Sequence, residues 1–160
     1  MASTAEQAAQ RPSEGAQVVS RRFGTFEVPE SAILHFGQGL VGLPGHRRYV
    51  IVEHRPGSPF KWMLSLDDPE LAFAVANPGE LVAGYQPPLA LAARLLGVPA
   101  EELALFVIVT IPPDPTRMTV NLMAPVVVDL RTRQARQIVL DDPRCPPDHR
   151  VVGDAPSACP

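Results

Sequence analysis

Proline is the residue that most constrains what this chain can fold into. Nineteen of its 160 residues are proline, about 12% against an ordinary share of about 5%. A proline inside an α-helix removes a backbone hydrogen bond and clashes with the preceding turn, so prolines belong in loops, strand edges and chain ends. Long helices are therefore disfavoured, and the sequence predicts a mainly β protein.

The apolar residues occur in short segments bounded by proline, glycine or aspartate. This spacing predicts strands at 18–28 (interrupted at Gly24), 33–36, 49–53, 60–66, 71–76, 103–111, 117–130 and 135–140. The last three follow one another through short turns, which predicts an antiparallel meander. One helix is predicted between Pro88 and Gly97, because proline suits a helix start and glycine a left-handed stop, and a shorter helical turn follows at 100–103.

Length and charge bound the class of protein. A chain of 160 residues suffices for one domain, which we expect at 18–142 between a disordered tail at 1–17 and a proline-rich flexible tail at 143–160. The net charge of −3 provides no basic field, so direct nucleic-acid binding is not predicted. With no leader pattern and no apolar run of about eighteen residues, we expect a cytoplasmic protein without a membrane partner, monomeric on its own.

The two cysteines, Cys145 and Cys159, both lie in the proline-rich tail. They form no CxxC motif and no paired framework of the kind that marks a zinc site or a disulfide-rich domain. We therefore expect two unpaired thiols rather than a disulfide.

Glycines cluster in the loop GQGLVGLPG at 37–45, near His35, His46 and His54. Clustered glycines can cradle a phosphate, but this loop lacks a GK[ST] ending and a strong following helix, so a structural turn is favoured. The histidines match no metal-ligand spacing, and no serine lies in a nucleophile elbow. The sequence thus predicts a non-enzymatic protein without a metal or cofactor.

Adjacent acidic residues occur at Asp67–Asp68, Glu101–Glu102 and Asp141–Asp142. The first and last of these pairs precede a proline, in DDPE and DDPR, which is typical of turns. A turn role is favoured, and the alternative is an acidic docking patch for a basic partner.

Two residues interrupt the apolar segment TVNLMAPVVVDL at 119–130, namely Asn121 and Pro125. Proline removes a hydrogen bond from a strand ladder and is tolerated at an edge or a bulge, while asparagine can bond a neighbouring loop or a partner's backbone. We therefore predict an edge or bulge here. It is either structural and covered by a tail, or a surface on which another chain docks.

Five blocks of the chain, in order, resemble the bacterial flagellar assembly factor FliW family over about residues 18–142. The blocks are RFGTFEV, ILHFGQGLVGLPG, MLSLDDPELAFAVANP, LFVIVTIP and TVNLMAPVVVDLRTRQARQIVLDD. The resemblance implies a small, mostly antiparallel β-barrel-like domain with one or two short helices that carries out no chemistry. It also implies two protein partners, flagellin and the translational repressor CsrA, the carbon storage regulator.

The resemblance further implies an exchange between these partners. Accumulated flagellin occupies the regulator and leaves CsrA free to block flagellin translation, and export of flagellin returns the regulator to CsrA. Because family members bind CsrA away from its RNA surface, the antagonism is allosteric and requires coupling between the two binding free energies.

We expect the partner-binding surface at the NLMAP segment, with Asn121 as a hydrogen-bonding group and Phe73 as an apolar anchor. Its acidic rim would consist of Asp67, Asp68, Asp141 and Asp142. Two other hypotheses stay open. One is a small β-barrel enzyme or ligand carrier that uses the loop at 37–45. The other is a chaperone for flagellin alone, because His46 and the tail from Arg144 depart from the family pattern.

Overall fold

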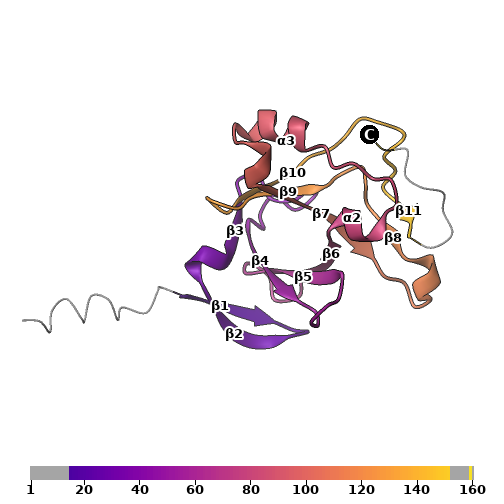
Figure 1. The fold of residues 1–160 in the computed structure, drawn as a ribbon. Coiled ribbons are helices and arrows are strands. Elements are labelled where there is room, and N and C mark those ends of the chain that lie inside the picture. Colours follow the sequence, from indigo (N-terminus) through magenta and orange to yellow (C-terminus); the bar gives the residue numbers. More distant parts are fainter. Residues whose placement is uncertain (1–14, 152–158, 160) are drawn as a thin grey trace, which may run out of the picture.

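The computed structural model describes residues 15–151 and residue 159, which fold mainly into short strands (Figure 1). The strands are β1 (Gly15–Ser20), β2 (Gly24–Pro29), β3 (Ile33–Phe36), β4 (Arg48–Glu53), β5 (Phe60–Ser65), β6 (Ala72–Ala76), β7 (Leu103–Thr110), β8 (Thr119–Val120), β9 (Val126–Asp129), β10 (Gln134–Gln137) and β11 (His149–Arg150). The α-helices are α2 (Pro78–Leu81) and α3 (Leu89–Leu96), and 3-10 turns lie at Glu30–Ala32, Ala100–Glu102 and Pro115–Arg117. The predicted mainly β fold with short helices is confirmed.

The strands close into a barrel. Its order is β7, β6, β5, β4, β3, β10 and β9, and β9 pairs back with β7 to complete the ring. Neighbours in the ring are antiparallel except β3 and β10, which are parallel. Closure leaves these seven strands no open edge, which removes a template for unwanted pairing with other chains.

The inward and outward faces of β7 show how the cores are divided. Leu105 and Val107 are buried on the outward face, in one cluster with residues of α2 and α3. Phe106 and Ile108 alternate with them and join Tyr49 in the cluster that fills the barrel. Successive side chains of a strand point to opposite faces, so β7 contributes apolar residues to both clusters.

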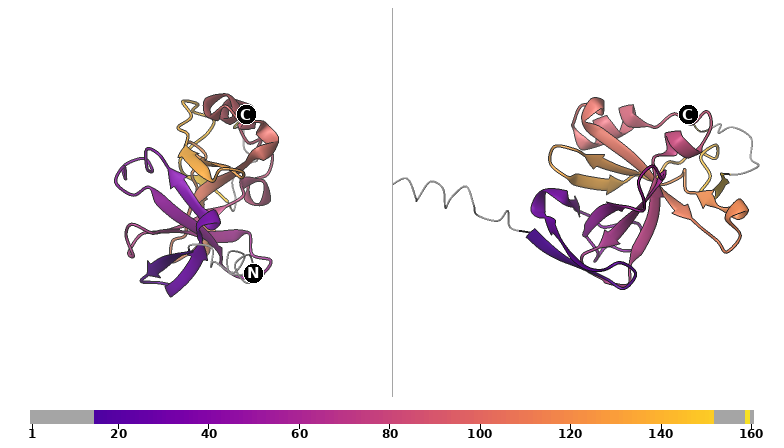
Figure 2. Two further views of the ribbon diagram at one scale, coloured as in Figure 1. Left: turned by 90° about the vertical axis from the view of Figure 1, so that its left-hand side faces the viewer. Right: turned by 60° about the horizontal axis from the view of Figure 1, so that its bottom comes forward.

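Two further elements cover the outside of the barrel. Helix α3 lies over β9 and β10, and Gly97 follows its last residue with a φ of 69°, which provides the predicted left-handed stop (Figure 1). On the opposite side, the β1–β2 hairpin packs over β3, β4 and β5, as both views in Figure 2 show. The hairpin brings Val18 and Val28 against Ile33, Val50 and Leu64.

The predicted strand 117–130 is divided into β8 and β9, with residues 121–125 between them. Val109 of β7 pairs with Val120, and Phe106 pairs with Val126. Moving three residues along β7 therefore corresponds to moving six residues from β8 to β9. The meander of β7, β9 and β10 is therefore antiparallel as predicted, and the predicted bulge is present as a break in the strand.

The C-terminal segment differs from the prediction of a flexible tail from residue 143. Residues 149–150 form β11 against β8, and the N–H of Leu122 donates to the carbonyl of Pro146 at 3.0 Å. Residues 143–151 are thus part of the folded domain, and β1 already begins at Gly15. The remaining parts of both predicted tails, 1–14, 152–158 and 160, lie outside the described residues.

The prediction of two unpaired thiols is wrong. Cys145 and Cys159 form a disulfide, and both are buried in the same apolar cluster as Val120 and Leu122. The physical reason is the return of residues 143–151 along β8, which carries Cys145 into this cluster. Spacing in the sequence gave no sign of that return.

Candidate partner-binding site

The break between β8 and β9 is stabilised by the side chain of Asn121. Its Oδ1 accepts hydrogen bonds from the backbone N–H of Met123 at 3.0 Å and of Ala124 at 3.1 Å. The backbone N–H of Asn121 meanwhile donates to the carbonyl of Ile108 at 2.9 Å, which extends the ladder with β7. Asn121 therefore ends the strand pairing and holds the turn that follows.

Backbone groups of the break are also bonded on its outer side. Ile138 donates to the carbonyl of Pro125 at 2.9 Å, and Leu140 donates to the carbonyl of Met123 at 2.7 Å. The backbone of the break is thus paired with residues 138–140, which belong to the predicted strand 135–140 and not to the predicted tail. A partner chain would meet the side chains of this segment rather than an open strand edge.

Gln137 joins the break to the glycine-rich loop at 37–45. Its Oε1 accepts from the backbone N–H of Val41 at 2.8 Å, and its Nε2 donates to the carbonyl of Ala124 at 3.1 Å. The loop itself is a tight turn in which Gly39 has a φ of 68°, and a Cβ there would collide with the Leu43 carbonyl. The structural role predicted for these glycines is confirmed at Gly39.

Between the loop and the break lies an open groove of about 350 Å³. Phe73 and Ile108 form part of its wall, and Asn121 and Met123 lie at the break. The remaining lining residues are Leu40, Val41, Leu43, Ala124, Gln137 and Val139. The groove brings together Phe73 and Asn121, which were both expected at a partner surface. We call it the loop–break groove.

The most exposed side chains of the loop–break groove are apolar. Val41 is 64% exposed and Val139 is 58% exposed, although valine is normally a buried residue. Phe73 is half-buried, and its ring centroid lies 6.4 Å from that of Tyr49 in the barrel core. The groove is therefore an apolar surface that continues into the inner core.

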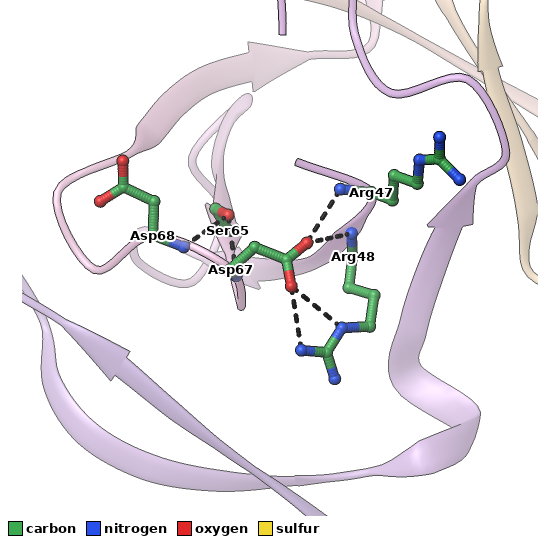
Figure 3. Close-up of polar contacts among 5 residues, drawn as sticks. All are labelled: Arg47, Arg48, Ser65, Asp67 and Asp68. Atoms are coloured by element: carbon green, nitrogen blue, oxygen red, sulfur yellow. Dashed lines mark hydrogen bonds and ion pairs between the residues drawn. The ribbon is translucent and has the colours of Figure 1, made fainter. Parts of the chain in front are cut away.

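Asp67 and Asp68 lie away from this groove, in the turn between β5 and β6 (Figure 3). The Asp67 carboxylate accepts from the backbone N–H groups of Arg47 and Arg48 at 2.9 and 3.0 Å, and from the Arg48 guanidinium at 3.1 and 2.9 Å. Ser65 Oγ accepts from the N–H of both aspartates, and Asp68 Oδ1 accepts from the N–H of Glu70. Both aspartates thus shape the turn.

The network around Asp67 also sets its ionisation. Burial acts to raise the pKa of Asp67, but the backbone N–H groups of Arg47 and Arg48 and the Arg48 guanidinium outweigh it, and the pKa lies below its ordinary value. Because Arg47 lies two residues after the glycine-rich loop at 37–45, Asp67 holds the chain where it leaves that loop.

Asp141 and Asp142 are nearer to the loop–break groove. They line a shallow neighbouring pocket that also contains Met123, which is common to both. Asp142 pairs with Arg144 at 2.8 Å, and hydrogen bonds from the Arg144 side chain and backbone hold the pKa of Asp142 below its ordinary value. Asp141 is exposed and makes no ion pair with another described residue. A binding role for these acids stays a prediction.

Sequence reasoning missed Gln137 and Val139 of this site, whereas Met123 lies in the predicted NLMAP segment. Gln137 directly precedes the apolar residues 138–140, and Val139 lies among them, so neither position carries a sequence signal of its own. Among residues 15–151 and 159, no three histidine, cysteine, aspartate or glutamate side chains gather as a metal site would require. In the same part of the chain, no helix has the length and apolarity to cross a membrane.

Known proteins resemble the chain along nearly its whole described length. A model of the FliW protein family matches residues 17–151. A flagellar assembly factor FliW from Caldicellulosiruptor saccharolyticus is 38% identical over 131 residues, covering 81% of this chain and 86% of the relative. One from Bdellovibrio bacteriovorus is 39% identical over 127 residues, covering 78% and 73%.

The fold comparison agrees with these sequence matches. The crystal structure of a flagellar assembly factor FliW superimposes with a TM-score of 0.77 at 25% identity, covering 87% of this chain and 99% of the other. The family match spans every strand of the barrel, the loop at 37–45 and the break at 121–125. The chain belongs to the FliW family of flagellar assembly factors.

Proposed function

We propose that this protein is a non-enzymatic regulator that binds flagellin and the translational repressor CsrA through the loop–break groove. Family membership supports the role in flagellar assembly. The observation that carries the binding site is the apolar groove of about 350 Å³ bordered by the exposed Val41 and Val139. Covering such side chains with a partner removes apolar surface from water, which favours association.

The chemistry of the groove suits two different partners. Met123 is flexible and polarizable, so it can adapt its shape to more than one apolar surface. The Asn121 side chain keeps its Nδ2 group for a partner, because only its Oδ1 is used by the turn. A single surface that accommodates both flagellin and CsrA makes the two compete, which is the basis of the proposed exchange.

The negative charge beside the groove favours a basic partner. Asp141 is exposed next to the pocket that shares Met123 with the groove. An exposed rim charge of this kind chiefly changes the association rate and its salt dependence. Binding of CsrA in this way would lower its affinity for RNA through allosteric coupling.

The test is calorimetric titration of the protein with CsrA and then flagellin from the same organism. Val139→Asp places a charge in the apolar groove at an exposed position, so the fold should tolerate it. We expect each partner to bind about tenfold more weakly or worse, the effect of losing one buried valine contact. Leu95→Asp is the matched control, because Leu95 is 47% exposed on α3 and lies outside the groove.

The outcomes separate the hypotheses. CsrA binding that flagellin displaces, weakened by Val139→Asp and unchanged by Leu95→Asp, supports the proposal. Binding of flagellin alone would leave the protein a flagellin chaperone. Equal affinities in both variants and the wild type would show that the partners do not bind at the loop–break groove.

A further inference from the structure

A second cavity of about 340 Å³ opens at the other end of the barrel core. Phe106 lines this cavity, whereas Ile108, the next inward residue of β7, lines the loop–break groove. Between them the core is filled by Tyr49 and Met63, which are fully buried. The two openings therefore lie at opposite ends of one packed interior, and this one has no part in the function proposed above.

The wall of this cavity changes from apolar to charged towards its mouth. On β4, Tyr49, Ile51 and Glu53 share one face and pass from buried to exposed. Lys61 of β5 stands directly opposite Glu53, and the two form an ion pair at 3.6 Å. Leu34 and Val128 complete an apolar floor. A charged rim over an apolar floor is the arrangement of a small-molecule site.

Arg133 is the third charged residue of this mouth. Glu53 and Lys61 neutralise each other, and Arg133 has no ion-pair partner among the described residues, so the rim carries one net positive charge. This contrasts with the net charge of −3 for the whole chain. The mouth therefore favours a negatively charged group.

The backbone of Arg133 gives an independent reason to single it out. Its φ is 62°, and within the described chain it is the only residue other than glycine with a positive φ. Glycine adopts this conformation freely, whereas a side chain there carries a cost of about 1 kcal/mol or more. Residues held in such conformations cluster at ligand sites.

We propose that this end of the barrel binds a small aliphatic carboxylate, with the carboxylate on Arg133 and the alkyl chain against Ile51, Phe106 and Val128. A guanidinium matches a carboxylate with two parallel hydrogen bonds, and the apolar floor excludes water from the chain. The cavity volume of about 340 Å³ lies at the small end of the range for such ligands.

An acidic peptide fits this cavity less well. The strands around it belong to the closed ring, so no strand edge is available there to pair with a peptide backbone. A peptide would therefore lose hydrogen bonds to water without replacing them, whereas an alkyl chain has none to lose.

The first test is calorimetric titration of the full chain with decanoate, combined with methyl NMR. We expect saturable binding of one decanoate, with shifts in the methyl signals of Leu34, Ile51 and Val128. Decan-1-ol, which has the same chain without the charge, should bind about fivefold more weakly. The proposal is overturned if the binding of decanoate does not saturate or if the methyl shifts occur at Val41 and Val139 instead. It is also overturned if an acidic peptide displaces the bound decanoate.

Two variants at the mouth of the cavity should change the affinity for decanoate in opposite directions, and a third variant is the control. Arg133→Gly should weaken decanoate binding about fivefold, while the thermal midpoint stays equal or rises because the strained backbone conformation is relieved. Glu53→Gln should strengthen binding about twofold or more by removing a repulsive carboxylate. Arg131→Gln is the matched control, since Arg131 lies in the same turn, pairs with Glu102 and does not line the cavity.

The pattern across the variants decides the matter. Loss of affinity in Arg133→Gly with no change in Arg131→Gln supports the site. Equal loss in both would show a general effect of net charge, and unchanged affinity in Arg133→Gly would show that the carboxylate is held elsewhere. Either result would overturn the proposal.

Discussion

The backbone N–H of Val41 donates to the Oε1 of Gln137 at 2.8 Å, across 96 residues of sequence. The same side chain donates to the carbonyl of Ala124, so one amide joins the glycine-rich loop to the break in the β8–β9 strand. These two segments form facing sides of the loop–break groove. The shape of the groove therefore depends on Gln137.

Replacing Gln137 should both destabilise the protein and loosen the groove. Gln137→Leu keeps the size of the side chain but leaves the Ala124 carbonyl without its partner, which costs about 1–3 kcal/mol of unfolding free energy. Urea denaturation measures this loss. Gln134→Leu, at an exposed position on the same strand, is the control and should stay within about 0.5 kcal/mol of the wild type. Equal losses in the two variants would contradict the role of Gln137.

Asn121 has two separable roles, one in the turn and one towards a partner. Asn121→Ala removes the acceptor for the N–H groups of Met123 and Ala124, and we expect a loss of about 1–2 kcal/mol in unfolding free energy. Asn121→Asp keeps the acceptor and should recover most of this stability. If Asn121→Asp also binds CsrA and flagellin as the wild type does, the Nδ2 group makes no contact with either partner.

Asp67 should make the stability depend on pH. Its pKa is lower in the folded protein than in the unfolded chain, so its contribution is complete above the unfolded value and is lost as the pH falls through the folded value. At pH 7, Asp67→Asn should be about 1–3 kcal/mol less stable, because hydrogen bonds to a charged carboxylate are lost. Urea denaturation from pH 7 to pH 2 should show this difference narrowing in acid, and a constant difference would contradict the assignment.

The disulfide should stabilise the domain chiefly by restricting its unfolded chain. Cys145 and Cys159 are 14 residues apart, and closing a loop of that length contributes about 3 kcal/mol in the chain-entropy account. The double variant Cys145→Ser/Cys159→Ser should lose a comparable amount in denaturation experiments. Alkylation of the native protein without reductant should modify neither cysteine. Two alkylated cysteines would contradict the pairing.

Much of the fold could be predicted because its signals are local. Alternating apolar residues mark the strands, Gly97 ends α3, and Pro125 with Asn121 marks the break. The turn role favoured for Asp67 and Asp68 also agrees with the structure, since Ser65 and Glu70 bond them within a few residues.

The missed features depend on contacts between distant segments. The disulfide requires residues 143–151 to return along β8, and no local pattern predicts that return. The side chain of Gln137 bonds Ala124 and Val41, which lie 13 and 96 positions away in the sequence. The alternation of residues along a strand does not predict such bonds. For the site itself, the sequence indicated Phe73 and Asn121, while the valines of its rim were visible only after the loop and the break had been brought together.

The most direct test of the central claim is hydrogen–deuterium exchange of the protein alone, with CsrA, and with flagellin. Our account predicts that both partners slow exchange in the loop at 37–45 and the break at 121–125, the two sides of the loop–break groove. The β1–β2 hairpin, which lies outside the groove, should exchange at the same rate in all three samples. Protection by both partners at the hairpin, with none at the loop and the break, would contradict the account.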